Sequence, residues 1–193
     1  PGAAAGPLGP GRDAGGPPDV PDGVGVSVDV GPDLLLDTEF PGIVADRLRK
    51  HEVAPSRLTV EATETSLMKN PARARAVLCG LHDAGVRISV DDFGAGCSSL
   101  AYLKDLPTDE IKIAAAFVRA ATVSRRDACI VRAVIVLGRH LDLRLVALGV
   151  DDEACRRLMD AWGCDAAQGL HPGPPVPRKA WRRRLRRESG VPT

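Results

Sequence analysis

The chain has 193 residues, of which 44% are hydrophobic and 26% charged, a composition typical of a globular protein with one main core. Aromatic residues make up only 3%, which argues against stacking on single-stranded nucleic-acid bases as the main activity. The formal net charge is +1, but basic residues crowd the C-terminal end, so a mildly acidic body precedes a strongly basic tail.

The composition divides the chain into three segments. Residues 1–23 are rich in Gly, Pro and Ala, so we expect a disordered linker that buries little apolar surface. Residues 24–177 alternate short β-branched runs with longer helical stretches, which is the pattern of βα units around a parallel sheet. Residues 178–193 form a basic C-terminal tail. The sequence therefore predicts one α/β domain between a linker and a tail.

Six strands and four clear helices are expected in the middle segment. We place the strands at residues 24–30, 58–63, 87–91, 110–113, 144–148 and 165–168. The helices are expected at residues 40–51, 71–84, 125–141 and 151–162. Pro71 suits the start of the second helix, and Asp151 is the expected cap of the last one.

The cysteines and the hydropathy pattern bear on location. The five cysteines form an odd set without CxxC spacing, which fits neither a disulfide framework nor a zinc site. No stretch approaches the roughly 20 continuous apolar residues of a membrane span. We therefore expect a cytoplasmic protein with reduced thiols and no membrane span.

Each expected strand sorts into an aliphatic face and a polar face, because successive side chains point to opposite sides. The polar faces end in Asp29, Glu61, Asp91, Lys112 and Gln168. Parallel (β/α) folds place their sites at the C-terminal ends of strands, so these side chains should converge there. A solvated strand end is the simpler interpretation for any one strand, but repetition across at least four strands favours a site.

Clustered carboxylates raise each other's pKa unless a cation neutralises them. These strand ends hold no His or Cys, so a hard cation such as Mg2+, Mn2+ or Ca2+ is the expected neutraliser. Asp91 and Asp92 are the strongest candidate ligands. The residues that follow include Gly94 and Gly96, which permit a tight turn, and Ser98, which can cap the next helix. Such a loop beside a metal could act as a lid.

Three stretches of sequence occur in a fixed order: VEATETS at residues 60–66, SVDDFGAGCSSLAYLKDLPTDEIKI at 89–113 and AAQG at 166–169. Together they resemble the EAL-domain family of cyclic-di-GMP-specific phosphodiesterases. The resemblance implies a (β/α)8 TIM-barrel-like fold, truncated at the N-terminus with about six strands present. It also implies a metal-dependent hydrolase, in which Mg2+ or Mn2+ activates a water that opens cyclic-di-GMP to linear pGpG.

The resemblance assigns a role to each matching residue. Its implied metal ligands are Asp29, Glu61, Asp91 and Asp92, its catalytic lysine is Lys112, and its substrate-binding amide is Gln168. The residues that it implies for support of the DDFG loop are Thr63, Glu64, Gly94, Gly96 and Ser98.

Several positions depart from the family pattern. The EAL motif is absent, and the segment that should supply it would precede residue 24. Asp29 stands where the family has Asn, and Leu148 stands where it has a metal-binding Glu. Ala114 replaces an Asp, and Asp151 replaces a second Glu. Even outer-shell changes cost roughly 10- to 100-fold in affinity or activity, so we predict no useful hydrolysis.

Three interpretations remain open. The first is a degenerate, catalytically inactive EAL domain that binds cyclic-di-GMP or a protein partner and pairs as a homodimer or with that partner. The second is an active cyclic-di-GMP phosphodiesterase whose N-terminal half lies outside this sequence. The third is a generic α/β domain whose basic tail binds nucleic acid or anionic lipid. We rank the first highest and regard nucleic-acid binding as the least supported.

Overall fold

Six parallel strands form one sheet in the computed structural model, which describes residues 24–96, 103–177 and 179–181. The strand order follows the chain, and all five pairings are parallel. The strands are β1 (Val26–Asp29), β2 (Leu58–Thr63), β3 (Arg87–Phe93), β4 (Glu110–Ile113), β5 (Arg144–Leu148) and β6 (Ala166–Gln168). The expected α/β class and the six strands are therefore confirmed.

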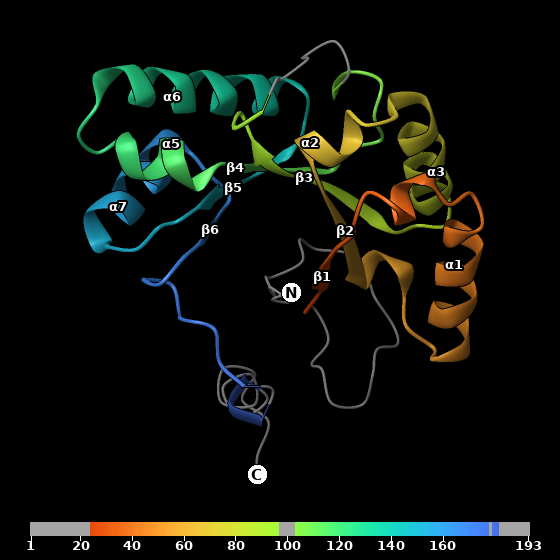
Figure 1. Ribbon diagram of the computed structural model, residues 1–193. Helices are drawn as coiled ribbons and strands as arrows, with labels where there is room; N and C mark the ends of the chain where they lie inside the picture. The colour runs from red at the N-terminus through yellow and green to blue at the C-terminus, as the bar shows by residue number, and fades with distance from the viewer. Residues whose placement is uncertain (1–23, 97–102, 178, 182–193) are drawn as a thin grey trace.

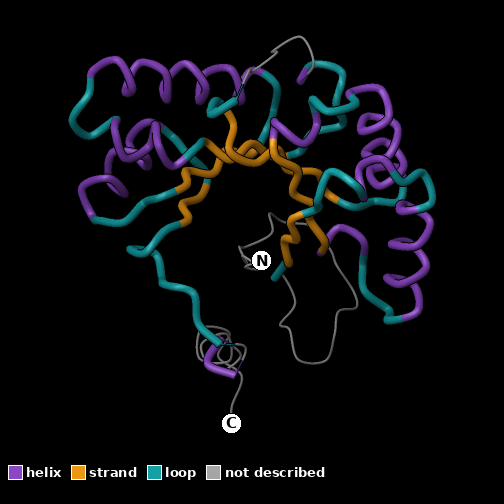
Figure 2. Tube along the Cα trace, in the orientation of Figure 1, coloured by secondary structure: helices purple, strands orange, loops and turns teal. Residues whose placement is uncertain are grey.

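The sheet curls into part of a barrel, with the helices on its convex side (Figures 1 and 2). In the described part of the chain, β1 and β6 each pair on one side only, so the barrel is not closed there. The helices are α1 (Phe40–Lys50), α2 (Glu64–Leu67), α3 (Pro71–Asp83), α5 (Ala115–Ala120), α6 (Arg125–His140) and α7 (Glu153–Trp162). Two short 3-10 helices, η1 (Leu34–Leu36) and η2 (Pro55–Arg57), precede α1 and β2.

The core lies between the sheet and this helical layer. Val60 pairs with Ile88 and Ile111 pairs with Leu145 on β2 to β5, and none of the four exposes more than 2% of its surface. Each such side chain contributes roughly 1.5–3 kcal/mol by leaving water. Val28 was expected on the same helix-facing side, but it is 45% exposed because β1 is an edge strand of the described sheet.

Helix α6 approaches strand β5 unusually closely at Gly138. A Cβ atom on Gly138 would lie 2.5 Å from Leu145 Cδ2, which is shorter than any van der Waals contact allows. Glycine therefore lets the helix backbone rest directly on the side chain of the strand.

The expected cap of α7 was wrong by one residue. The helix begins at Glu153, and Asp152 caps it by accepting a hydrogen bond from Cys155 N at 2.8 Å. A capping carboxylate must directly precede the first helical residue to reach the free N–H groups of the first turn. Asp151 lies one residue too early, and its carboxylate bonds to Leu170 and Arg119 instead.

Strands β2, β4 and β5 have the predicted bounds, the other expected elements differ from expectation by one or two residues at their ends, and β1 starts two residues later than predicted. Among the described residues, no helix combines the length and apolar content needed to cross a membrane.

Candidate functional site

Three carboxylates meet where β1, β2 and β3 end. Asp29 pairs with Glu61 in the β1–β2 register, and Thr63 pairs with Asp91 in the β2–β3 register. One carboxylate oxygen of Asp29, Glu61 and Asp91 lies within 4.8 Å of an oxygen of each of the others. The structure therefore brings together three of the four predicted metal ligands.

Lys112 crosses the inside of the curled sheet to meet this group. Its Nζ forms an ion pair with Glu61 Oε1, and both side chains are only 5% exposed. The same Nζ donates a hydrogen bond to Gln168 Oε1 at 3.3 Å. Lys112 thus links β2 to β6 through the concave side, and the two residues predicted for catalysis and substrate binding are in contact.

Burial dominates the electrostatics of the carboxylates. It raises the pKa of Glu61, although the ion pair with Lys112 and a hydrogen bond from Ser27 oppose the shift. Burial also raises the pKa of Asp91, where Lys112 opposes the shift while the nearby charges of Asp92 and Asp29 add to it. Two ionised carboxylates in this position would therefore be stabilised by a further positive charge.

The donor set fits one divalent cation. Asp91 Oδ1 is buried and has no hydrogen-bond partner among the described residues. An unsatisfied buried oxygen costs about 1–3 kcal/mol, and a cation would satisfy it. Asp29, Glu61 and Asp91 supply only oxygen, which is the donor that Mg2+ and Mn2+ prefer.

Asp92, the fourth predicted ligand, is not part of this group. It is exposed, and its φ of 51° places it in the left-handed region that few residues other than glycine adopt. The register between β3 and β4 also shifts between Val90 and Phe93. Regular alternation therefore ends here, and Asp92 does not join the group of Asp29, Glu61 and Asp91.

The predicted loop-support residues make local contacts beside β3. Thr63 caps α2 by accepting from Ser66 N at 3.2 Å. Glu64 is buried and accepts from Gly94 N at 3.3 Å. A Cβ on Gly96 would lie 3.3 Å from the Glu64 carboxyl group, so glycine allows this close approach. Ser98 lies outside the described residues.

The substituted positions lie at the ends of β4 and β5. Leu148 ends β5 and pairs with Gln168 in the β5–β6 register. Ala114 directly follows β4 and is 1% exposed. Neither side chain carries a donor atom for a cation. This side of the sheet therefore adds the amide of Gln168 to the site but no carboxylate from β4 or β5.

A second polar layer lies on the same face of β3 to β5, nearer the start of β4 and β5. Ser89 Oγ donates to Glu110 Oε1 at 2.9 Å, and Arg144 Nη1 donates to Glu110 Oε2 at 3.1 Å. Ser89 and Glu110 lie on the polar faces of their strands, but side-chain alternation alone does not indicate this pairing. Because Arg144 neutralises Glu110, Lys112 remains the partner of Glu61.

Comparison with known protein families identifies the family to which this chain belongs. The family model described as EAL domain matches residues 16–175. The chain belongs to the EAL domain family. This EAL domain is 42% identical over 134 residues to the bifunctional diguanylate cyclase/cyclic di-GMP phosphodiesterase MucR of Pseudomonas aeruginosa. The match covers 69% of the chain but only 20% of MucR, so the chain spans about a fifth of that relative.

Solved EAL structures share the fold. The EAL domain of Mycobacterium smegmatis DcpA superposes with a TM-score of 0.82 at 33% identity, covering 87% of this chain and 75% of that one. A manganese and cyclic-di-GMP complex of Klebsiella pneumoniae BlrP1 gives a TM-score of 0.70 at 30% identity, covering 75% and 37%. The expected TIM-barrel-like EAL fold is therefore confirmed.

Proposed function

We propose that this EAL domain binds cyclic-di-GMP and a divalent cation without useful hydrolysis. The observation that carries the proposal is the asymmetry of the site: carboxylates gather on β1 to β3, whereas β5 ends in Leu148. Two-metal hydrolysis needs cations that stabilise both the attacking and the leaving oxygen. The described carboxylate group offers ligands for one.

The remaining residues suit binding. Asp29, Glu61 and Asp91 would hold Mg2+ or Mn2+, which supplies positive charge for a phosphate oxygen. Lys112 adds a fixed cation beside them, and the exposed Gln168 offers an amide that can donate and accept hydrogen bonds. The BlrP1 complex with manganese and cyclic-di-GMP supports this ligand class.

Calorimetric titration of the 193-residue chain with cyclic-di-GMP, with and without Mn2+, tests the proposal. We expect binding that strengthens with Mn2+, and chromatography should detect no pGpG. Gln168→Ala should weaken binding roughly tenfold, because it removes a hydrogen-bonding group from the site. Production of pGpG that stops on chelation would identify an active phosphodiesterase instead. The absence of binding under both conditions would refute the binding role.

We also propose pairing with a second copy through the outer side of α6. Ile130 and Val136 are 42% and 55% exposed there, and Val136 lies on a shallow surface patch with Arg132 and His140. Light scattering should give twice the chain mass, and Val136→Asp should halve it. A monomeric wild type would refute the homodimer and leave a different protein partner as the alternative.

A cytoplasmic location belongs to the same proposal. All four cysteines among the described residues carry free thiols, which supports a reducing compartment.

A further inference from the structure

The end of the last strand and the residues after it, 168–171, are tied to the backbone that follows β5. Val150 N donates to Gln168 O at 3.1 Å, and His171 N donates to Val150 O at 3.2 Å. A Cβ on Gly169 would overlap the backbone of Val150. The two stretches of backbone are therefore in direct contact, and only glycine fits at position 169.

Asp151 reinforces this contact with both carboxylate oxygens. Oδ1 accepts from Leu170 N at 3.0 Å, and Oδ2 accepts from Arg119 Nε at 2.8 Å. The hydrogen bond from Leu170, followed by that from Arg119, lowers the pKa of Asp151 below its ordinary value. Asp151 thus joins helix α5, the turn after β5 and the segment of residues 168–171.

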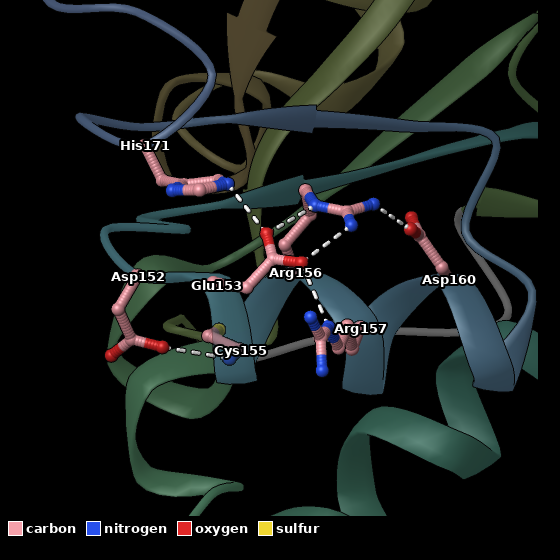
Figure 3. Close-up of polar contacts among 7 residues, drawn as sticks. All are labelled: Asp152, Glu153, Cys155, Arg156, Arg157, Asp160 and His171. Atoms are coloured by element: carbon pink, nitrogen blue, oxygen red, sulfur yellow. Dashed lines mark hydrogen bonds and ion pairs between the residues drawn. The ribbon is translucent and has the colours of Figure 1, made fainter.

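Glu153 holds the far end of the same segment (Figure 3). His171 Nε2 lies 2.9 Å from Glu153 Oε2. Glu153 also accepts from Arg156 and Arg157 on α7, and these hydrogen bonds lower its pKa to about 2. Glu153 is therefore a fixed negative charge on α7, against which His171 rests.

The fastened segment begins with Gln168, whose Oε1 accepts from Lys112 Nζ. Gln168 is exposed, so its amide reaches Lys112 only while the backbone around it keeps its Cα in place. We propose that Asp151 is a positioning residue for nucleotide binding: by holding Leu170 N, it holds the backbone after Gln168 where the Gln168 amide reaches Lys112. This inference rests on the proposed binding of cyclic-di-GMP. It gives Asp151 a role through the chain backbone rather than through a cation.

The first test needs no nucleotide. In the 193-residue chain, Asp151→Ala should speed deuterium exchange of the Leu170 amide at least tenfold, because the N–H loses its acceptor. It should also move the NMR signals of the Gln168 side-chain amide toward those of a free glutamine. Asp151→Asn keeps an oxygen for Leu170 and should retain most of the protection. Unchanged exchange and unchanged Gln168 signals in Asp151→Ala would overturn the inference.

The second test is a double-mutant cycle in cyclic-di-GMP affinity. Asp151→Ala should weaken binding roughly tenfold. Because Asp151 acts through Gln168, the same change should have little further effect when Gln168→Ala is already present. An equal loss in both backgrounds would mean that Asp151 acts by another route, and would also overturn the inference.

A matched control removes an exposed ion pair elsewhere. Asp46 on α1 pairs with Arg49 at 2.6 Å, and both side chains are largely exposed. Asp46→Ala should leave both the exchange of Leu170 and the nucleotide affinity unchanged. If the wild-type chain binds no cyclic-di-GMP, the proposed function fails, whereas the exchange and NMR measurements still decide the role of Asp151.

Discussion

Lys112 and Glu61 form a buried ion pair between β4 and β2, strands that are separated in the sheet by β3. The curl of the sheet makes this contact across its concave side. Taking two charges out of water is costly, so each depends on the other for compensation. The pair therefore affects both the stability of the curled sheet and the candidate metal site, to which Glu61 belongs.

Lys112→Met should destabilise the fold by about 3–5 kcal/mol, because it leaves the Glu61 carboxylate buried without its cation. Urea unfolding of the variant and the wild type measures the loss. Adding Glu61→Gln should recover part of it. Lys104 is exposed, so Lys104→Met should change stability by no more than about 0.5 kcal/mol. Equal effects at the two lysines would contradict a stabilising role of the pair.

Leu148→Glu should raise the affinity for Mn2+ at least tenfold, because it supplies a carboxylate at the end of β5 beside Gln168. Calorimetry with Mn2+ alone measures the change. Val123→Glu adds the same charge at a side chain that is 89% exposed and distant in sequence from every candidate ligand. If both variants bind Mn2+ equally, Leu148 does not occupy a ligand position.

The contribution of Glu61 and Asp91 to the stability of the metal-free fold should fall as the pH rises from the acid side. Burial raises the folded-state pKa of Glu61 and Asp91 above the ordinary values of 4.5 and 3.8. The folded state therefore holds these protons more tightly, and the resulting stability is full below the ordinary values and lost as pH rises through the folded ones. Asp91→Asn should flatten this fall, and Mn2+ should reverse it at neutral pH.

Urea midpoints of Asp91→Asn and the wild type, measured with a chelator between pH 4 and 8, test this pH dependence. Parallel curves for Asp91→Asn and the wild type would show that Asp91 does not carry it.

Asp152→Ala should cost about 1 kcal/mol in the free energy of unfolding, because Cys155 N loses its capping acceptor. Asp152→Ser restores a hydroxyl acceptor and should recover most of that loss. Ser124 caps α6 by accepting from Asp127 N at 3.3 Å, so Ser124→Ala is a matched loss at another helix. Thermal unfolding of the three variants measures the effects, and an unchanged midpoint in Asp152→Ala would rule out the cap.

The strands, and the grouping of polar side chains at their C-terminal ends, could be predicted from the sequence. Strands β2, β4 and β5 have the predicted bounds, because each is a short run rich in aliphatic residues between turn and helix signals. The gathering of Asp29, Glu61 and Asp91 follows from parallel strands ending at one edge. These features depend on local patterns and on one rule of topology.

Other features depend on geometry that no local pattern encodes. The contact of Lys112 with Glu61 requires the curl of the sheet, which alternation alone does not specify. Asp92 leaves the carboxylate group because of one left-handed backbone angle. The bond between Arg119 and Asp151 joins elements that have no shared periodicity. Long-range contacts and single dihedral angles therefore account for what the sequence did not reveal.

Gly138 lies on α6, outside the candidate site, but it packs on the strand that ends at Leu148. With no side chain there, the backbone of α6 seats on Leu145, within the strand whose end carries Leu148. An added methyl group at position 138 would force the fully buried side chain of Leu145 to move. A position in the helical layer, with no side chain of its own, thus sets how closely α6 packs on the strand that ends at Leu148.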